Sequence, residues 1–315
     1  MRMNILSAGP LTTIQDEGRF GHMASGFSPN GAMDLRSLRI ANILAGNVPG
    51  DAALEMTMMG VTASFDCDTV LALTGADMSP LLDGEEIPMY RAIPVSAGSV
   101  LQLGMAKSGM RGYLAVAGGF DIPHVMGSFS TNLKVGLGGF AGRKLQNGDE
   151  IPLRTAMNPI FIGKRVTVNP DTYPSEITLR VVPGPQDDYF TEDGMRTFLS
   201  TAYTVTDKSD RMGVRLDGSR IESKNGVDIL SDGVATGSVQ IPASGTPIIM
   251  MADRQTTGGY AKIATVISAD LPQIAQAKPG TKVRFAAVTQ QEAAKIYKKD
   301  VQRMKMLEYQ MLMER

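Results

Sequence analysis

Three clusters of charged and amide side chains lie among glycines, and their composition suits the binding of an anion. Arginine offers a planar fork of donors that fits a carboxylate or a phosphate, and aspartate or glutamine can orient that fork. Glycines let backbone N–H groups approach the same ligand. The clusters are residues 12–19 with 28–34, residues 209–213 and residues 252–260. The candidate binding residues in them are Gln15, Asp16, Arg19, Asn30, Asp34, Asp210, Arg211, Gln255, Thr256, Thr257 and Tyr260, and the candidate catalytic residues are Asp253 and Arg254.

The same residue types also have a structural interpretation. Asp–Arg pairs close turns and tie loops between strands. For a single cluster the two interpretations stay open. Three clusters in one chain favour a binding site in at least one of them.

Several familiar catalytic signatures are absent from the sequence. It contains no G-x-x-x-x-G-K-[ST] phosphate loop, no G-x-S-x-G and no H-E-x-x-H. Cys67 is the only cysteine, so a cysteine-based metal site would need more thiolates. His22 and His124 have no partner at a ligand spacing, and we predict no metal site. The glycine-rich run 136–142 resembles a dinucleotide loop, but no helical pattern follows it.

The tripeptide Met304-Lys305-Met306 matches the sequence around a biotinylated lysine. Biotin is attached at the tip of a β-hairpin, whereas this tripeptide lies in a helical pattern with no β domain around it. We therefore expect a solvated helix lysine and no biotin attached to this chain.

Composition and charge predict a folded protein of about two domains. The chain has 315 residues, and domains average roughly 150. Its 31 basic and 32 acidic side chains give a net charge of -1, which offers no attraction to nucleic acid or acidic membranes. The N-terminal residues lack the apolar core of a secretion signal. We expect a cytoplasmic protein that binds neither nucleic acid nor membrane.

Strand signals dominate the chain, and its 34 glycines and 17 prolines favour many short strands. The Asp83-Gly84 pair predicts a hairpin turn. Helices are predicted at residues 35–44, with Asp34 as the cap, and at residues 187–199. Short apolar runs predict strands at residues 70–74, 113–117, 179–182 and 248–252.

The C-terminal residues 289–315 differ from the rest and predict an amphipathic helix. Thr289 and Glu292 form a capping-box pattern, and more than twenty residues without glycine or proline follow. This helix is expected to dock on the body of the protein or on a partner. Its apolar positions recur every three or four residues at Tyr297, Val301, Met304, Leu307 and Met311.

A faint internal repeat relates the two halves of the chain. It predicts two related β domains, residues 1–160 and 161–288, followed by the C-terminal helix 289–315. Glu55 and Gln240 occupy equivalent positions of the repeat. A carboxylate on an apolar strand is either buried and paired or poised for proton transfer, so Glu55 is a candidate catalytic residue and Gln240 a candidate binding residue. The matching segments are 9–10 with 184–185, 54–60 with 239–245, 113–123 with 262–272, and 148–151 with 280–283.

Long motifs in both halves are similar to those of the KipA-like, allophanate hydrolase subunit 2 family. The resemblance covers residues 4–288. In the first half it rests on GPLTTIQDEGRFGH, SPNGAMD, ALEMTMMG, TGAD and YLAVAGGFD. In the second half it rests on VVPGPQDDYF, SDRMGVRL, ADRQTTGGYAKIATVISADLP and PGTKVRF.

The resemblance implies a mainly β fold with two cyclophilin-like β-barrel domains. It implies one component of an ATP-dependent 5-oxoprolinase, a hydrolase that opens 5-oxo-L-proline to L-glutamate. The implied partners are a KipI-like B subunit, together with a LamB/YcsF-like A subunit, and ATP and Mg²⁺ are used at the level of the complex. Two alternatives come from other relatives, namely the carboxyltransferase component of a urea carboxylase and a non-catalytic antagonist of a KipI-like kinase inhibitor.

An ATP-dependent amide hydrolase needs cationic groups for phosphoryl oxygens. The resemblance makes Arg19, Arg211 and Arg254 the candidates for this role. Asp16, Asp210 and Asp253 are expected to hold the three arginines, and Gln255, Thr256 and Thr257 to supply polar contacts. Because the chain lacks a phosphate loop, the ATP site would be of unfamiliar type or shared with a partner.

Overall fold

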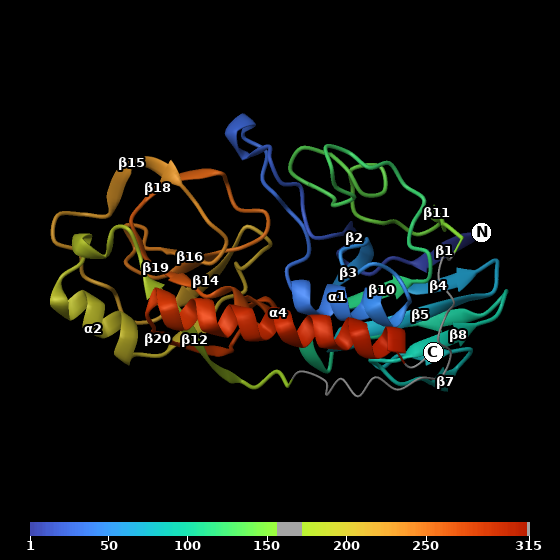
Figure 1. The fold of residues 1–315 in the computed structure, drawn as a ribbon. Coiled ribbons are helices and arrows are strands. Elements are labelled where there is room, and N and C mark those ends of the chain that lie inside the picture. Colours follow the sequence, from blue (N-terminus) through green and yellow to red (C-terminus); the bar gives the residue numbers. More distant parts are fainter. Residues whose placement is uncertain (156–171, 314–315) are drawn as a thin grey trace. The chain divides into compact units, whose positions relative to one another are not determined.

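The computed structural model describes residues 1–155 and 172–313 (Figure 1). The predicted domain boundary at residues 160 and 161 lies outside the described residues. The chain divides into two compact units, which we describe separately. The first unit comprises Met1–Phe20, Asn30–Thr172 and Arg303–Arg315, and the second comprises Gly21–Pro29 and Tyr173–Gln302.

Two antiparallel sheets form the first unit. The five-stranded sheet has the order β2 (Thr12–Gln15), β3 (Ala53–Thr57), β10 (Ser108–Val116), β5 (Thr69–Asp77) and β8 (Ala92–Val95). The six-stranded sheet has the order β11 (Glu150–Pro152), β1 (Arg2–Ser7), β4 (Thr62–Phe65), β9 (Val100–Gln102), β6 (Leu81–Leu82) and β7 (Glu85–Glu86). Asp83 and Gly84, both at positive φ, form the predicted turn between β6 and β7.

The core of the first unit lies between these two sheets. Side chains such as Leu54, Leu73 and Leu114 of the five-stranded sheet share one buried cluster with Ile5 and Phe65 of the six-stranded sheet. Since side chains alternate along a strand, the neighbouring residues of β3, β5 and β10 point to the opposite face. Helix α1 (Leu35–Leu44) covers that face, where it packs on β5 and β10 (Figure 1).

Helix α1 has the bounds that the sequence predicts, because its start is determined locally. The Asp34 side chain accepts hydrogen bonds from the Ser37 N–H at 3.0 Å and the Ser37 hydroxyl at 2.6 Å. Leu38 and Leu44 are fully buried against the sheet. The cap fixes the start of α1, and the buried leucines pack the helix on the strands that it covers.

A closed seven-stranded barrel forms the second unit. Its strand order is β12 (Glu176–Pro183), β19 (Lys262–Val266), β16 (Ser238–Gln240), β17 (Ile248–Met250), β14 (Gly213–Asp217), β13 (Tyr203–Val205) and β20 (Lys282–Ala287). A separate two-stranded ribbon pairs β15 (Asp228–Gly233) with β18 (Thr257–Tyr260). The predicted mainly β fold is confirmed. The short 3₁₀ and α-helices of this unit are η1 (Met23–Ser25), η2 (Asp187–Tyr189), α2 (Glu192–Ser200), η3 (Ser268–Asp270) and α3 (Leu271–Ala275).

The helix predicted over residues 187–199 is interrupted. Residues Asp187–Tyr189 form a 3₁₀ turn, and α2 begins only at Glu192. Phe190 has extended backbone angles, and the Thr191 hydroxyl caps α2 by accepting the Gly194 N–H at 2.9 Å. The capping residue therefore starts a new helix and does not extend the preceding turn.

The long C-terminal helix α4 (Gln290–Met313) has the predicted capping box. Thr289 and Glu292 exchange hydrogen bonds between their side chains and each other's backbone N–H groups. Leu307 and Met311 are buried in the first unit, in the cluster that contains α1. The assignment of Tyr297 to the apolar face is wrong, because its side chain is 52% exposed. Among the described residues, no helix is apolar over a stretch long enough to span a bilayer.

The internal repeat is visible in one pair of strands of each unit. Strands β3 and β10 pair antiparallel with Glu55 opposite Tyr113, and β16 and β19 pair antiparallel with Gln240 opposite Lys262. The flanking strands differ, since β1 pairs with β11 antiparallel while β12 pairs with β20 parallel. The repeat thus preserves the two strands that carry Glu55 and Gln240.

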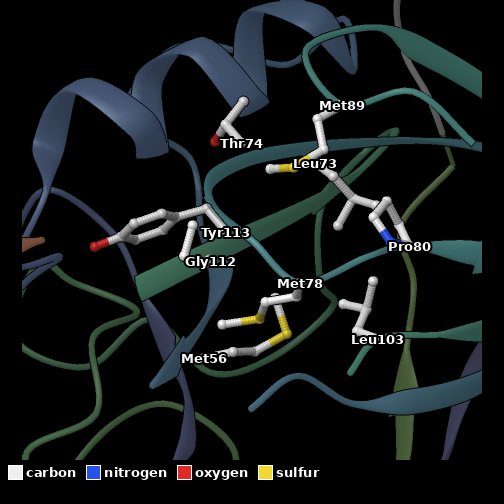
Figure 2. A pocket seen from close by; sticks show the side chains of 10 residues that line it. Met56, Leu73, Thr74, Met78, Pro80, Met89, Leu103, Gly112 and Tyr113 are labelled. Atoms are coloured by element: carbon white, nitrogen blue, oxygen red, sulfur yellow. The ribbon is translucent and has the colours of Figure 1, made fainter. Parts of the chain in front are cut away.

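A small apolar cavity of about 10 Å³ lies in the first unit (Figure 2). The side chains of Met56 and Met78 lie near Gly112 at its wall. A Cβ atom at Gly112 would lie 2.9 Å from the Met78 sulfur, which belongs to a flexible side chain next to the cavity. At Gly184, by contrast, a Cβ atom would lie 2.1 Å from the Lys262 carbonyl oxygen of β19.

These surroundings predict opposite responses to added Cβ atoms. Gly112→Ala should change the free energy of unfolding by less than about 1 kcal/mol, because Met78 can shift and alanine restricts the unfolded chain. Gly184→Ala should destabilise the protein by about 1–3 kcal/mol, because backbone must move. Urea unfolding of the full chain measures both. Equal losses in the two variants would contradict this account of the packing.

Candidate functional site

A row of buried polar side chains crosses the five-stranded sheet of the first unit. Thr13 of β2, Glu55 of β3, Tyr113 of β10 and Thr74 of β5 lie directly opposite one another in register. Each is at most 2% exposed. They lie on the face that α1 covers, where Thr74 Oγ1 donates to the Ser37 carbonyl of α1 at 2.7 Å. The row therefore joins the sheet to the helix by hydrogen bonds as well as by apolar packing.

Glu55 is the ionisable centre of this row. Its Oε2 accepts hydrogen bonds from the Tyr113 hydroxyl at 2.7 Å and the Met33 N–H at 2.8 Å. The Tyr113 hydroxyl in turn accepts the Asp34 N–H at 2.9 Å. Burial, together with the negative charges of Glu55 and Asp34, raises the pKa of Tyr113 well above its usual value. Glu55 is thus buried and paired, and its role in proton transfer stays a prediction.

Asp16 holds the loop of residues 128–130. Its carboxylate accepts hydrogen bonds from the hydroxyls of Ser128 and Ser130, and from the backbone N–H groups of Phe129 and Gly18. From the sequence we expected Asp16 to hold Arg19, but no hydrogen bond joins these two side chains. The loop satisfies the carboxylate instead, because four donors from it and from the adjacent turn surround Asp16.

Arg19 is fully buried and donates to uncharged oxygens. Its guanidinium donates to the Val125 carbonyl at 3.1 Å, the Ser130 carbonyl at 2.9 Å and Asn30 Oδ1 at 3.3 Å. Burial lowers the pKa of Arg19, while the charge of Asp16 acts in the opposite direction. Asn30, which accepts from Arg19, has a left-handed backbone conformation with a φ of 57°. Arg19 therefore ties three chain segments together and offers no exposed face to a ligand.

Gln15 has a buried acceptor without a partner among the described residues. Its Nε2 donates to Thr13 Oγ1 at 3.0 Å and to the Thr131 carbonyl at 3.2 Å. Its Oε1 is buried and accepts no hydrogen bond there.

The first sequence cluster is divided between the two units. The first unit contains its candidate residues Gln15, Asp16, Arg19, Asn30 and Asp34, whereas Ser28 belongs to the second unit.

In the second unit, Arg211 pairs with Asp253. The guanidinium donates through Nε at 2.9 Å and Nη2 at 3.0 Å to the two carboxylate oxygens. Of the aspartates expected to hold the arginines, Asp253 therefore holds Arg211, whereas Asp210, among the described residues, accepts only backbone N–H groups. Asp210 is exposed and accepts the N–H groups of Met212 and Gly213, which closes a turn before β14. Arg211 and Asp253 are brought together from different loops.

Arg254 is buried and donates to main-chain carbonyls. Its Nε donates to the Val234 carbonyl at 2.8 Å, and its Nη1 donates to the Met251 carbonyl at 3.4 Å. Burial lowers the pKa of Arg254. Like Arg19 in the first unit, this arginine organises backbone.

The neighbouring polar residues lie on or beside the ribbon. Thr257 and Tyr260 belong to β18, where Tyr260 is 40% exposed. The Thr256 carbonyl accepts the Val234 N–H at 3.0 Å. Gln255 Oε1 is a buried acceptor without a partner among the described residues.

Lys262, the residue opposite Gln240, was not identified from the sequence. Its side chain is 4% exposed, and its Nζ lies 2.7 Å from Asp232 Oδ2. Gln240 is also buried, and its Nε2 donates to the Tyr260 carbonyl at 3.4 Å. The repeat contained the signal, because it aligns Lys262 with Tyr113 and Gln240 with Glu55. A lysine is rarely buried unless it is paired, so its place in an apolar strand indicates a specific partner.

The three predicted arginines do not fit the role of phosphate ligands. The Arg19 guanidinium donates to neutral oxygens, Nε and Nη1 of Arg254 donate to main-chain carbonyls, and Arg211 pairs with the Asp253 carboxylate. All three side chains are at most 6% exposed. The described residues also contain no group of three or more histidine, cysteine or acidic side chains placed to hold a metal ion. We therefore assign no ATP contact to these arginines.

Comparison with known families matches residues 25–287 to the carboxyltransferase domain, subdomain A and B. The match covers most of the chain, so the chain belongs to this family. The resemblance found in the sequence motifs is confirmed. The family defines the class of the protein, and individual relatives narrow it.

Two similar proteins match this chain along nearly their whole length. The 5-oxoprolinase C subunit of Haemophilus influenzae is 41% identical over 298 residues, which cover 95% of both chains. The 5-oxoprolinase C subunit of Escherichia coli is 40% identical over 297 residues, which cover 93% of both chains.

Other relatives are much longer proteins. The urea amidolyase of Saccharomyces cerevisiae is 32% identical over 312 residues, covering 91% of this chain but 17% of that protein. The crystal structure of Kluyveromyces lactis urea amidolyase matches with a TM-score of 0.91 at 28% identity. That match covers 97% of this chain and 20% of the amidolyase chain.

The buried row predicts a measurable contribution from one hydroxyl. Tyr113→Phe should lower the free energy of unfolding by about 1–3 kcal/mol, because Asp34 N–H and Glu55 Oε2 both lose a buried partner. Tyr309→Phe, at an exposed position of α4, is the matched control and should change stability by less than about 0.5 kcal/mol. Urea unfolding compares the two. A Tyr113→Phe loss no larger than that of the control would show that the hydroxyl does not stabilise the unit.

Proposed function

We propose that this chain is the C subunit of a 5-oxoprolinase, a hydrolase that opens 5-oxo-L-proline to L-glutamate. The observation that carries the proposal is the match at 41% identity over 95% of both chains to a protein with that name. The urea amidolyase matches are weaker in identity and cover only 17–20% of those proteins. A relative that matches along nearly its whole length supports the same role more strongly than a match to a small part of a larger enzyme.

We further propose that the working enzyme is a complex. The relatives' name implies further subunits, and the proposed partners are a KipI-like B subunit, together with a LamB/YcsF-like A subunit. ATP with Mg²⁺ would drive the opening of the unactivated lactam, in which a ring C–N bond breaks and water supplies the new carboxylate oxygen. Because the three arginines are at most 6% exposed and already donate to protein oxygens, we place the nucleotide contacts outside these arginines.

Glu55 remains the candidate for proton transfer on this chain. Glu55→Gln keeps an oxygen that can accept from Tyr113 and Met33, so this variant removes the ionisable group while the surroundings persist. Loss of a general acid or base typically costs a factor of about 10²–10⁴ in rate. A rate within threefold of wild type would exclude that role for Glu55 and leave it the structural one described above.

The central experiment measures ATP-dependent glutamate formation from 5-oxoproline. The cognate A-like and B-like subunits are mixed with and without this chain. We expect glutamate only when the chain is present, and Glu150→Gln, at an exposed position of β11, serves as a variant control that retains activity. Equal glutamate formation without the chain would overturn the proposal.

The alternative function is carboxyl transfer, which the family model favours. The same mixtures are therefore supplied with urea and carboxybiotin, and transfer of the carboxyl group to urea is measured. Carboxylation of urea that depends on this chain, without glutamate formation, would establish the alternative.

A further inference from the structure

Lys262 is the one lysine among the described residues that is buried. It lies in β19 of the barrel, and its ammonium group pairs with Asp232 at 2.7 Å. A buried ammonium without a negative partner is strongly unfavourable. The barrel therefore requires an anion at this position.

The anion at this position is the Asp232 carboxylate, and its side chain is much more exposed than that of Lys262. In the ion pairs Arg180–Asp270, Arg143–Asp149 and Arg154–Asp51, the carboxylate is the more buried partner. The cation is the more buried partner at Arg211–Asp253 and at Lys262–Asp232, and the difference is far larger at Lys262, where the Asp232 side chain is 54% exposed and the lysine 4%. The buried charge, on Lys262, belongs to the barrel, and the exposed charge, on Asp232, belongs to strand β15.

Asp232 comes from β15, an exposed strand that pairs only with β18 among the described strands. Five of the six residues of β15 are exposed, and Leu230 is 95% exposed. Its pairing with β18 has a register shift between Asp228 and Asp232. A segment with little buried surface opens locally at low cost in free energy. Asp232 thus belongs to an exposed ribbon that shares no strand pairing with the barrel in the described part of the chain.

The Asp232 carboxylate accepts hydrogen bonds from the barrel through Lys262 and from its own strand through Gly233. The hydrogen bonds from Lys262 Nζ, at 2.7 Å, and from the Gly233 N–H lower the pKa of Asp232, and the Gln186 side chain lowers it further. Gln186 is fixed in turn, because its Oε1 accepts the Lys262 backbone N–H at 3.2 Å. Lys262 and Gln186 thus remain in place when the ribbon moves.

We propose that Lys262 and Gln186 form a binding site for the carboxylate of a small ligand, and that Asp232 occupies this site until the ligand displaces it. The inference rests on the proposed function, since 5-oxoproline carries one carboxylate beside its lactam ring. The exchange keeps the buried ammonium paired throughout. It also places the ligand next to Gln240, the residue opposite Lys262 in β16.

The first test uses thermal unfolding of the full chain. Asp232→Asn leaves Lys262 without its carboxylate, so the variant should unfold at a lower temperature than wild type. Added 5-oxoproline should restore several degrees to this variant, and should shift wild type less because Asp232 competes. The lactam 2-pyrrolidinone, which lacks the carboxylate, should shift neither protein. Asp228→Asn, on the same strand, is the matched control and should behave as wild type.

The second test uses steady-state kinetics of the assembled complex. Asp232→Asn should lower the KM for 5-oxoproline several-fold, because the internal competitor is removed. Lys262→Met should raise KM at least tenfold, because the fixed charge is removed. An ion pair with a purely structural role would not produce opposite changes from its two partners.

Each result decides a separate question. Equal KM in wild type and both variants, with no ligand-dependent shift in Asp232→Asn, would overturn the carboxylate site while leaving the proposed function intact. A wild-type complex that forms no glutamate would overturn the proposed function. A shift of Asp232→Asn by 5-oxoproline in that case would still support the carboxylate site.

Discussion

The first unit depends on the hydrogen bond between the Tyr113 hydroxyl and the Glu55 carboxylate. A carboxylate buried in a sheet is tolerated only when donors surround it, and Tyr113 and the Met33 N–H supply them. The same hydroxyl accepts the Asp34 N–H, so the residue that caps α1 is tied to the centre of the sheet. Strand, loop and helix are thereby held by one connected network.

The second unit uses the equivalent two positions for different chemistry. Gln240 replaces the carboxylate, and Lys262 replaces the tyrosine. The network is consequently neutral at one position and cationic at the other, and its negative partner comes from the exposed strand β15. One unit of the repeat thus has an internally satisfied polar row, and the other has a fixed cation with an exchangeable anion. This difference leads us to place ligand recognition in the barrel.

Features determined by neighbouring residues were predictable from the sequence. They include α1 with its Asp34 cap, the capping box of α4 and the Asp83-Gly84 turn. The partners of the arginines were not, because those contacts join distant positions. Arg211 meets Asp253 across 42 residues, and Arg19 meets the Ser130 carbonyl across 111. The sequence clusters contain these polar residues, but only the fold shows that Asp16, Arg19 and Arg254 hold loops.

The most direct test of the account is hydrogen–deuterium exchange in the assembled complex, with and without 5-oxoproline. The ligand should release Asp232 from Lys262, so the backbone amides of β15 should exchange faster when 5-oxoproline is bound. The strands of the barrel, including β19, should keep their protection. Unchanged or slower exchange in β15 at saturating 5-oxoproline would contradict displacement of Asp232 by the ligand carboxylate.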